Sequence, residues 1–213
     1  TETSLVSQFR CGGSNEFLSW LDTLLYDNEN LFPFSEDPDK FEFRVFDNPA
    51  EMHEAIRNKN AHGEKSRMVA GYCWDWVSKK QKHLNDIVLD NGAYASQWNL
   101  TEHGSLWIER EESISEIGCI HTCQGLEVDY IGVIIGPDLR FENGELICDV
   151  SQRAKTDASI KGIKKMSREY PEKASALGKE LILNTYRTLM TRGMKGCYVY
   201  CTDSTLRDAI RKS

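Results

Sequence analysis

Three short segments of the chain contain residue types that bind phosphate, sugar or a nucleic-acid strand. In chain order they are residues 8–10, 117–129 and 184–193. Each combines polar or charged side chains with a nearby glycine, and two of them stand beside an apolar run. Arginine and glycine are common at nucleotide sites because a guanidinium binds phosphate in a planar fork and a glycine lets the backbone approach a ligand closely. These three segments are therefore the candidates for a functional site.

The middle segment is the most specific. A strand is predicted to deliver His121 and Thr122 to its carboxyl end, and Gln124-Gly125 then makes a close turn before Glu127. Parallel α/β sheets bind ligands at the carboxyl ends of their strands, so we expect these residues at such an end. There the Glu127 carboxylate would accept a hydrogen bond from a ribose hydroxyl. A strand–loop–helix joint that needs a glycine only for its geometry is the alternative.

Arginines mark the other two segments. Arg192 closes a predicted helix just before a strand, where it would either contact a γ-phosphate or satisfy the carbonyl end of the helix. Arg187 falls on a different part of the same helix surface and is expected to face nucleic acid or a partner domain. Arg10 precedes a Cys-Gly-Gly-Ser loop that leads into a helix, so it is either part of an anion site or a surface arginine.

The elements that position these segments alternate between strands and helices. Apolar spacing predicts helices at 15–27, after Pro49, at 171–190 and after Ser204. Strands are predicted from apolar runs at 41–46, 67–73, 117–120, 130–135 and 196–201. The run at 130–135 is apolar throughout, which is typical of a strand covered on both faces. This alternation predicts one α/β domain with a parallel sheet.

Finer details of these elements are also predicted. Ser14 and Ser204 are expected to cap helices, and 141–145 to form a hairpin turn. The helix at 171–190 is expected to bury one stripe of side chains: Leu177, Leu181, Ile182, Thr185 and Leu189. Residues 74–115 break the alternation and are interpreted as an insertion of short strands and loops. Its tryptophans, among them Trp76 and Trp98, could stack on bases, but a small satellite core is the preferred interpretation.

Composition limits the class of protein. The 213 residues are 40% hydrophobic and 28% charged, without an apolar run of the roughly 20 residues that cross a membrane. Residues 1–150 carry a balance of −15 and residues 151–213 a balance of +8, so only the basic third offers a phosphate-binding face. Seven cysteines without a secretory signal predict reduced thiols and a cytoplasmic protein. The start lacks a methionine, so a longer parent protein is expected.

The order of the three segments resembles motifs IV, V and VI of superfamily 1 helicases of the UvrD-like group. Gln8-Phe9-Arg10 is similar to motif IV, residues 121–127 to motif V, and Thr191-Arg192-Gly193 to the end of motif VI. Nearly the whole chain also resembles the Schlafen-group-3-like helicase domain family, through tracts at 69–74, 120–127, 132–139 and 184–201. The chain departs from the UvrD-like pattern where Gly193 replaces an alanine and Arg187 stands in the place of a tyrosine.

The resemblance implies that residues 1–213 form the second RecA-like motor domain of a helicase, with helices on both faces of the sheet and with 74–115 inserted. It implies roles for individual residues. Arg10 and Arg192 would act at the γ-phosphate across an interdomain cleft. The nucleotide would be contacted by Gln8, Gln124, Gly125 and Glu127. Single-stranded DNA or RNA would be contacted by His121, Thr122 and Arg187.

The chain lacks the rest of such a motor. No G-x-x-x-x-G-K-[ST] loop occurs in its sequence, and no apolar strand ends in an Asp-Glu pair for magnesium. The resemblance therefore places the domain in the P-loop NTPase superfamily without a P-loop of its own. ATP and Mg²⁺ are expected to bind only together with an upstream P-loop domain of the same protein. The isolated chain is expected to be inactive, and the full-length protein a nucleic-acid-dependent ATPase.

Two other functions remain open from the residues alone. A helicase-like half can serve as a non-catalytic module that binds nucleic acid or protein, with the 74–115 segment and the basic stretch 151–173 carrying the function. A zinc site would use Cys119, His121 and Cys123, with two more thiols added from 197 and 201. Burial of these cysteines in strands is the preferred interpretation. The scattered acids of 1–150 form no cluster of the kind that a nuclease needs.

Overall fold

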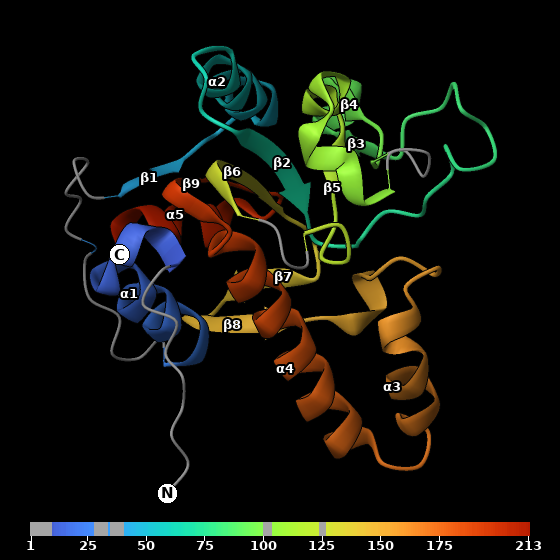
Figure 1. The fold of residues 1–213 in the computed structure, drawn as a ribbon. Helices are drawn as coiled ribbons and strands as arrows, with labels where there is room; N and C mark the ends of the chain where they lie inside the picture. The colour runs from blue at the N-terminus through green and yellow to red at the C-terminus, as the bar shows by residue number, and fades with distance from the viewer. Residues whose placement is uncertain (1–9, 28–33, 35–40, 100–103, 124–126) are drawn as a thin grey trace, which may run out of the picture.

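The computed structural model describes residues 10–27, 34, 41–99, 104–123 and 127–213, and a five-stranded sheet lies at its centre (Figure 1). The strand order is β1-β9-β6-β2-β5, and every neighbouring pair is parallel. The strands are β1 (Glu42–Val45), β2 (Ser66–Ala70), β5 (Ile117–Gly118), β6 (Val128–Ile135) and β9 (Gly193–Cys201). The parallel sheet predicted from the sequence is confirmed, although β5 ends two residues earlier than expected.

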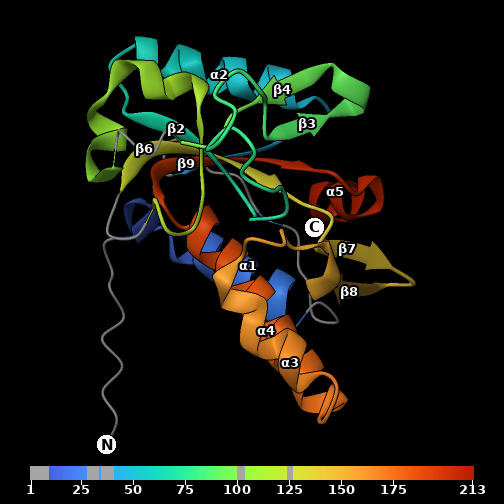
Figure 2. The same ribbon diagram turned by 90° about the vertical axis from the view of Figure 1, so that its right-hand side faces the viewer.

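Helices cover both faces of the sheet (Figure 2). The helices α1 (Asn15–Tyr26), α4 (Pro171–Met190) and α5 (Ser204–Lys212) pack on one face around a cluster that includes Trp20 and Ile182. The other face carries α2 (Pro49–Ala61) and the hairpin of β3 (Ile87–Leu89) and β4 (Tyr94–Ser96). Because both faces are covered, β6 and β9 bury almost every residue instead of alternating.

Two smaller elements extend from the sheet. A hairpin of β7 (Leu139–Glu142) and β8 (Glu145–Cys148) follows β6, which confirms the predicted turn. The short helix α3 (Lys161–Met166) packs against the first half of α4, and the pair projects away from the sheet (Figure 1). No helix among the described residues is long and apolar enough to span a lipid bilayer.

Helix caps explain where the helices begin. Ser14 Oγ accepts a hydrogen bond from Phe17 N at 3.2 Å, so the predicted cap of α1 is confirmed. The predicted cap of α5 is wrong by one residue: the carboxylate of Asp203 accepts from Leu206 N at 2.7 Å, and Ser204 is the first helical residue. Both residues are good caps, and a carboxylate gains further from the positive end of the helix dipole.

The predicted bounds of α4 are confirmed, but the predicted buried stripe is wrong in its first half. Leu177 is 38% exposed, while Ala174 and Gly178 are buried. A Cβ at position 178 would lie 2.3 Å from Val150 Cγ2, so only glycine fits there. The close packing of α4 on its neighbours therefore selects small residues and leaves the leucine outside.

The segment between β2 and β5 has a packed interior. Trp98 and Trp107 are both essentially inaccessible to solvent, and Trp98 Nε1 donates to the carbonyl of Trp74 at 3.1 Å. The preferred interpretation as core residues is thus confirmed for these two tryptophans. Trp74 and Trp76 are only half-buried. Whether 74–115 is an insertion in a RecA-like domain stays a prediction.

Candidate functional site

The amino ends of β6 and β9 bring two of the three predicted segments together. Glu127 directly precedes β6 and is exposed, and Arg192 directly precedes β9. Val128 N donates to the carbonyl oxygen of Arg192 at 3.1 Å, which ties the two segments at the same edge of the sheet. The expectation that Glu127 lies at the carboxyl ends of the strands is wrong. The chain passes from the carboxyl end of β5 to the amino end of β6 between residues 119 and 127.

The turn that directly follows the first segment also lies against β9. The 3-10 turn Arg10–Gly13 packs against β9, and Cys11 is fully buried in the same cluster as Cys197. Of the three predicted segments, the structure therefore brings those of Glu127 and Arg192 together, and the turn that follows the first segment packs against the same strand β9. The side chain of Arg10 lies outside the part of the chain that the structure describes, as do Gln8 and the Gln124-Gly125 pair.

Arg192 sits in the turn that ends α4 and is only 8% exposed. Burial raises the pKa of the Cys123 thiol to about 12, and the positive charge of Arg192 opposes that rise. The Arg192 side chain is therefore largely shielded from water. A charge in such a setting acts more strongly on a nearby anion than a charge on an exposed side chain.

The carboxyl end of β5 places the other predicted pair. After Gly118 the chain turns, with Thr122 N and Cys123 N donating to the Cys119 carbonyl at 3.0 and 3.1 Å. Thr122 Oγ1 donates to Asn99 Oδ1 at 2.7 Å, and His121 is exposed. His121 and Thr122 thus lie together, at a different end of the sheet from Glu127 and Arg192.

A cavity of about 350 Å³ opens beside this turn. Its walls come from the turn itself and from the segments that follow β2, β4 and β8. They are formed by Tyr72, Trp76, Asn99, Cys119, His121, Thr122, Thr156 and Ala158. The sequence did not predict this cavity, although Trp76, a tryptophan among polar residues, was a signal for it.

Arg187 has an intramolecular partner. Its Nε and Nη2 lie 2.5 and 3.0 Å from the two carboxylate oxygens of Asp22 on α1, and this hydrogen bonding raises the pKa of Arg187. Tyr26 of α1 also donates to Asn184 of α4 at 2.6 Å. Arg187 therefore joins α4 to α1, and its side chain does not lie with His121. Its contact with nucleic acid stays a prediction.

A buried charged network lies at the carboxyl ends of β2 and β6. Arg153 Nη1 is 3.1 Å from Asp138 Oδ2, and Arg153 Nε donates to Asp157 Oδ2 at 2.8 Å. Tyr186 of α4 donates to the other oxygen of Asp138 and accepts from Gly136 N at 2.9 Å. All three ionised side chains are at most 1% exposed. Sequence reasoning missed this network because its members are far apart in the chain.

The cysteines of the alternative zinc site do not lie together in the structure. The described part of the chain contains no group of three or more His, Cys, Asp or Glu that could hold a metal ion. Cys119 and Cys123 belong to clusters on opposite faces of the sheet.

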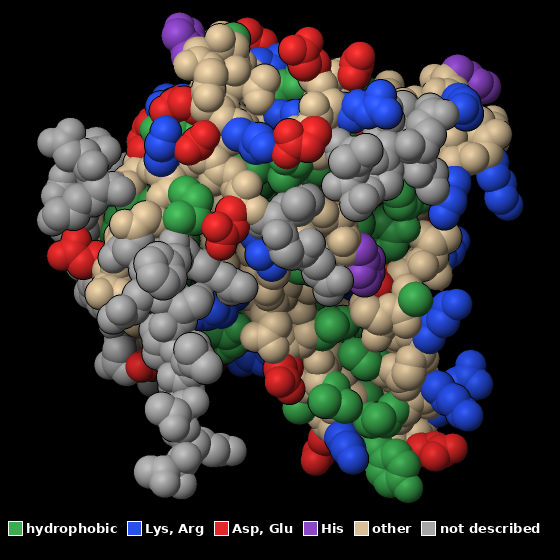
Figure 3. Space-filling model, in the orientation of Figure 1, with side chains coloured by type: hydrophobic (Ala, Val, Ile, Leu, Met, Phe, Trp, Pro, Cys, Tyr) green, Lys and Arg blue, Asp and Glu red, His purple; other side chains and the backbone are tan. Residues whose placement is uncertain are grey.

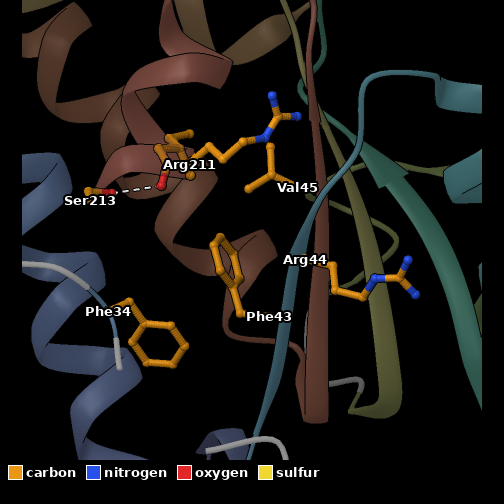
Figure 4. A pocket seen from close by; sticks show the side chains of 7 residues that line it. Phe34, Phe43, Arg44, Val45, Arg211 and Ser213 are labelled. Carbon is orange, nitrogen blue, oxygen red and sulfur yellow. Dashed lines mark hydrogen bonds between the residues drawn. The ribbon is translucent and has the colours of Figure 1, made fainter. Parts of the chain in front are cut away.

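A second cavity of about 390 Å³ lies between β1 and the end of α5, where Phe34 and Phe43 stand near each other and Arg44 points away (Figure 4). It contains none of the predicted site residues.

Comparison with known proteins decides the family. Residues 1–203 match the family described as Schlafen group 3, DNA/RNA helicase domain. The chain belongs to the Schlafen group 3 DNA/RNA helicase domain family. It is also 24% identical over 220 residues to the Saccharomyces cerevisiae protein named "Uncharacterized protein YPL245W". That alignment covers 97% of the chain and 47% of the yeast protein, so the chain spans about half the length of this relative. No solved structure matches.

Proposed function

We propose that this Schlafen group 3 helicase domain is the second, RecA-like motor half of an ATPase of the UvrD-like kind, and that it acts on single-stranded DNA or RNA. The observation that carries the proposal is the meeting of the segments of Glu127 and Arg192 at the amino ends of β6 and β9, with a turn of different chemistry at the carboxyl end of β5. Family membership supports a role connected with nucleic acid. The parallel α/β sheet is compatible with a RecA-like fold.

The nucleotide is proposed to bind at the amino ends of β6 and β9. Arg192 would stabilise charge on the γ-phosphate, assisted by Arg10, and Glu127 would accept from the ribose with Gln8, Gln124 and Gly125 nearby. ATP and Mg²⁺ would be held mainly by an upstream P-loop domain of the same protein, because the G-x-x-x-x-G-K-[ST] motif does not occur in this sequence. The guanidinium of Arg192 is a suitable group because it stays charged even when it is largely buried.

The carboxyl end of β5 is the proposed nucleic-acid side. His121 is exposed there, and Thr122 is held in place by Asn99 and by the backbone of Cys119. Two sites at different ends of one rigid sheet give a simple route for coupling. A change at the nucleotide would be transmitted to the strand through β6 and the segment that leads into it.

The test is ATP turnover by the full-length protein with and without single-stranded DNA and RNA. Arg192→Ala is expected to lower stimulated turnover by about 10³-fold or more, as for arginines that act in phosphoryl transfer. Arg57→Ala is the matched control, because that exposed arginine of α2 pairs with Glu54 at 3.7 Å and belongs to neither proposed site. If the wild type does not hydrolyse ATP, or if both variants behave alike, the motor proposal fails.

A non-catalytic binding module is the second candidate. It is favoured by the small exposure of Arg192 together with the missing phosphate-binding loop. In that case the fold would be retained from a helicase while hydrolysis is lost. Absence of turnover in the full-length protein, combined with strand binding whose affinity falls steeply with salt, would establish this candidate in place of the motor.

A further inference from the structure

We propose that the 350 Å³ cavity at the carboxyl end of β5 holds one unstacked base of a single strand of nucleic acid, whose phosphates run along the lysines of 79–82 and 155. The inference rests on the nucleic-acid half of the proposed function and adds residues that the helicase motifs do not include. It assigns Tyr72, Trp76 and Asn99 to base binding.

The cavity has the size and the fixed walls that a flat ring needs. Small-molecule sites typically measure about 300–1,000 Å³, and this one lies at the lower end of that range. Tyr72 stacks obliquely on Trp98, with ring centroids 5.3 Å apart, and its hydroxyl is 3.2 Å from Thr156 Oγ1. Ala154 N donates to the Tyr72 carbonyl at 3.0 Å. The walls are therefore already formed, and binding would cost little ordering.

Aromatic surface is available in the cavity. Trp76 is half-buried and lines the cavity together with His121, which is exposed. Bases stack on such side chains irrespective of sequence, with contributions of about 1–3 kcal/mol per base. Trp74 packs on Trp98 from the neighbouring position, with ring centroids 6.4 Å apart, so the segment that carries Trp76 is anchored to a buried ring.

A polar group in the wall can meet the edge of a base. Asn99 is 7% exposed and its Oδ1 accepts from Thr122 Oγ1 at 2.7 Å. Asn99 lines the cavity, and its amide carries two N–H donors in addition to the oxygen that Thr122 occupies. An amide donor in the wall suits the acceptor atoms of a base better than a purely apolar ligand.

Lysines flank the cavity on two sides. Lys79 Nζ lies 5.1 Å from the centroid of the Trp76 ring, and Lys80 follows it on the same exposed loop. On the other side Lys155 is exposed, and its backbone N donates to Asp75 Oδ1 at 2.8 Å, which joins the two flanks. In the space-filling view, Lys and Arg side chains gather along the right-hand side, over this loop and α3 (Figure 3). Residues 151–173 contain seven basic and three acidic side chains.

This arrangement favours a single strand over the other nucleic-acid ligands. A duplex keeps its bases paired and stacked, so it cannot place one in a cavity without extruding it. A free nucleotide would use the ring site but would not reach lysines on both sides. A strand fulfils both conditions, because successive phosphates contact the flanking lysines while one base turns inward.

The experiment measures binding of fluorescently labelled oligo-dT and oligo-U to the full-length protein by anisotropy. Trp76→Ala is expected to weaken binding by about 5- to 150-fold, and Trp76→Phe, which keeps a ring, by much less. Tyr26→Ala is the matched control, since it removes a half-exposed aromatic ring from α1 on the other face of the sheet. Thermal melting of each variant shows that it is folded.

An oligonucleotide that lacks its bases but keeps its phosphates separates stacking from charge. The inference predicts that it binds the wild type more weakly than oligo-dT and that Trp76→Ala weakens it no further. Replacing Lys79 and Lys80 by alanine is expected to reduce the slope of log affinity against log salt by about 1.4, from about 0.7 per phosphate contact. Equal losses for the normal and the abasic strand would overturn base binding in the cavity.

The outcomes also separate this inference from the proposed function. If the wild type binds single strands and Trp76→Ala binds equally well, the cavity is not the base site, while the nucleic-acid role stands. If the wild type binds neither DNA nor RNA strands, the nucleic-acid half of the proposed function fails with it. Binding of free nucleotides that matches oligonucleotide binding would overturn the assignment to a strand.

Discussion

Removal of the Asp138 carboxylate should destabilise the whole domain. Asp138 lies in the turn after β6 and accepts hydrogen bonds from Arg153 and Tyr186 with a side chain that is 0% exposed. Burial lowers the pKa of Arg153, but the nearby carboxylates of Asp138 and Asp157 raise it by more, so the net shift is upward. Without Asp138, a fully buried guanidinium would keep only one carboxylate partner, and the hydroxyl of Tyr186 would lose its acceptor.

The magnitude follows from the cost of an incompletely paired buried charge. Breaking a buried ion pair by removing one partner costs about 3–5 kcal/mol, so Asp138→Ala should lose about that much stability. For a domain of this size each kcal/mol lowers Tm by about 2–4 °C, which gives a decrease of about 6–20 °C. Asp138→Asn keeps the size of the side chain and a hydrogen-bond acceptor. It should therefore lose less, about 1–3 kcal/mol.

Urea unfolding followed by circular dichroism gives these free energies. Glu54→Ala is the control, because Glu54 pairs with Arg57 at 3.7 Å on the exposed side of α2 with a side chain that is 61% exposed. Such a surface pair contributes less than about 0.5 kcal/mol. If Asp138→Ala is no more destabilising than Glu54→Ala, the buried network does not hold residues 151–160 on the sheet, and the reasoning is refuted.

Three further changes test other parts of the structure. His53 is buried, with Nδ1 2.8 Å from the Tyr94 hydroxyl and Nε2 2.7 Å from a carbonyl, and burial lowers its pKa from 6.5 to about 4. The unfolded state therefore takes up the proton first, and about 3 kcal/mol of stability should be lost as pH falls from 6.5 to 4; a His53→Gln variant with the same pH dependence of unfolding would contradict this. Gly71→Ala should destabilise the fold by more than about 2 kcal/mol, because its Cβ would lie 2.0 Å from the Tyr186 hydroxyl, whereas Gly162→Ala meets no atom and should be neutral or stabilising in urea unfolding. Arg187→Ala should lower the free energy of unfolding by no more than about 1 kcal/mol, because its pair with Asp22 is partly exposed, and a loss of several kcal/mol in urea unfolding would contradict this.

The elements with strong local signals could be predicted from the sequence. The helix at 171–190 begins at a proline and the run at 130–135 is apolar throughout, so their type and position follow from residues within each element. Tertiary packing decided the details. Leu177 is exposed because small residues face the neighbours of α4, and Asp203 rather than Ser204 caps α5 although both residue types are suitable.

The candidate site could be predicted as a set of segments but not as an arrangement. The motifs marked residues around His121 and Arg192, and the structure brings the segments of Glu127 and Arg192 to one edge. His121 follows β5 as predicted, but Glu127 precedes β6, and because β5 and β6 point the same way the two residues lie at opposite ends of their strands, which no local pattern encodes. The pairing of Asp138 with Arg153 and Tyr186 joins residues up to 48 positions apart, so it also depends on the strand order.

The most direct test of the account separates the two proposed sites within one assay. ATP turnover by the full-length protein is measured while the concentration of single-stranded nucleic acid is varied, for the wild type, Arg192→Ala and His121→Ala. The account predicts that Arg192→Ala lowers the maximal rate by about 10³-fold without changing strand affinity. His121→Ala should raise the strand concentration needed for half-maximal stimulation and leave the maximal rate nearly intact. Loss of the same parameter in both variants, or no turnover in the wild type, would contradict the assignment of a nucleotide side and a nucleic-acid side to one sheet.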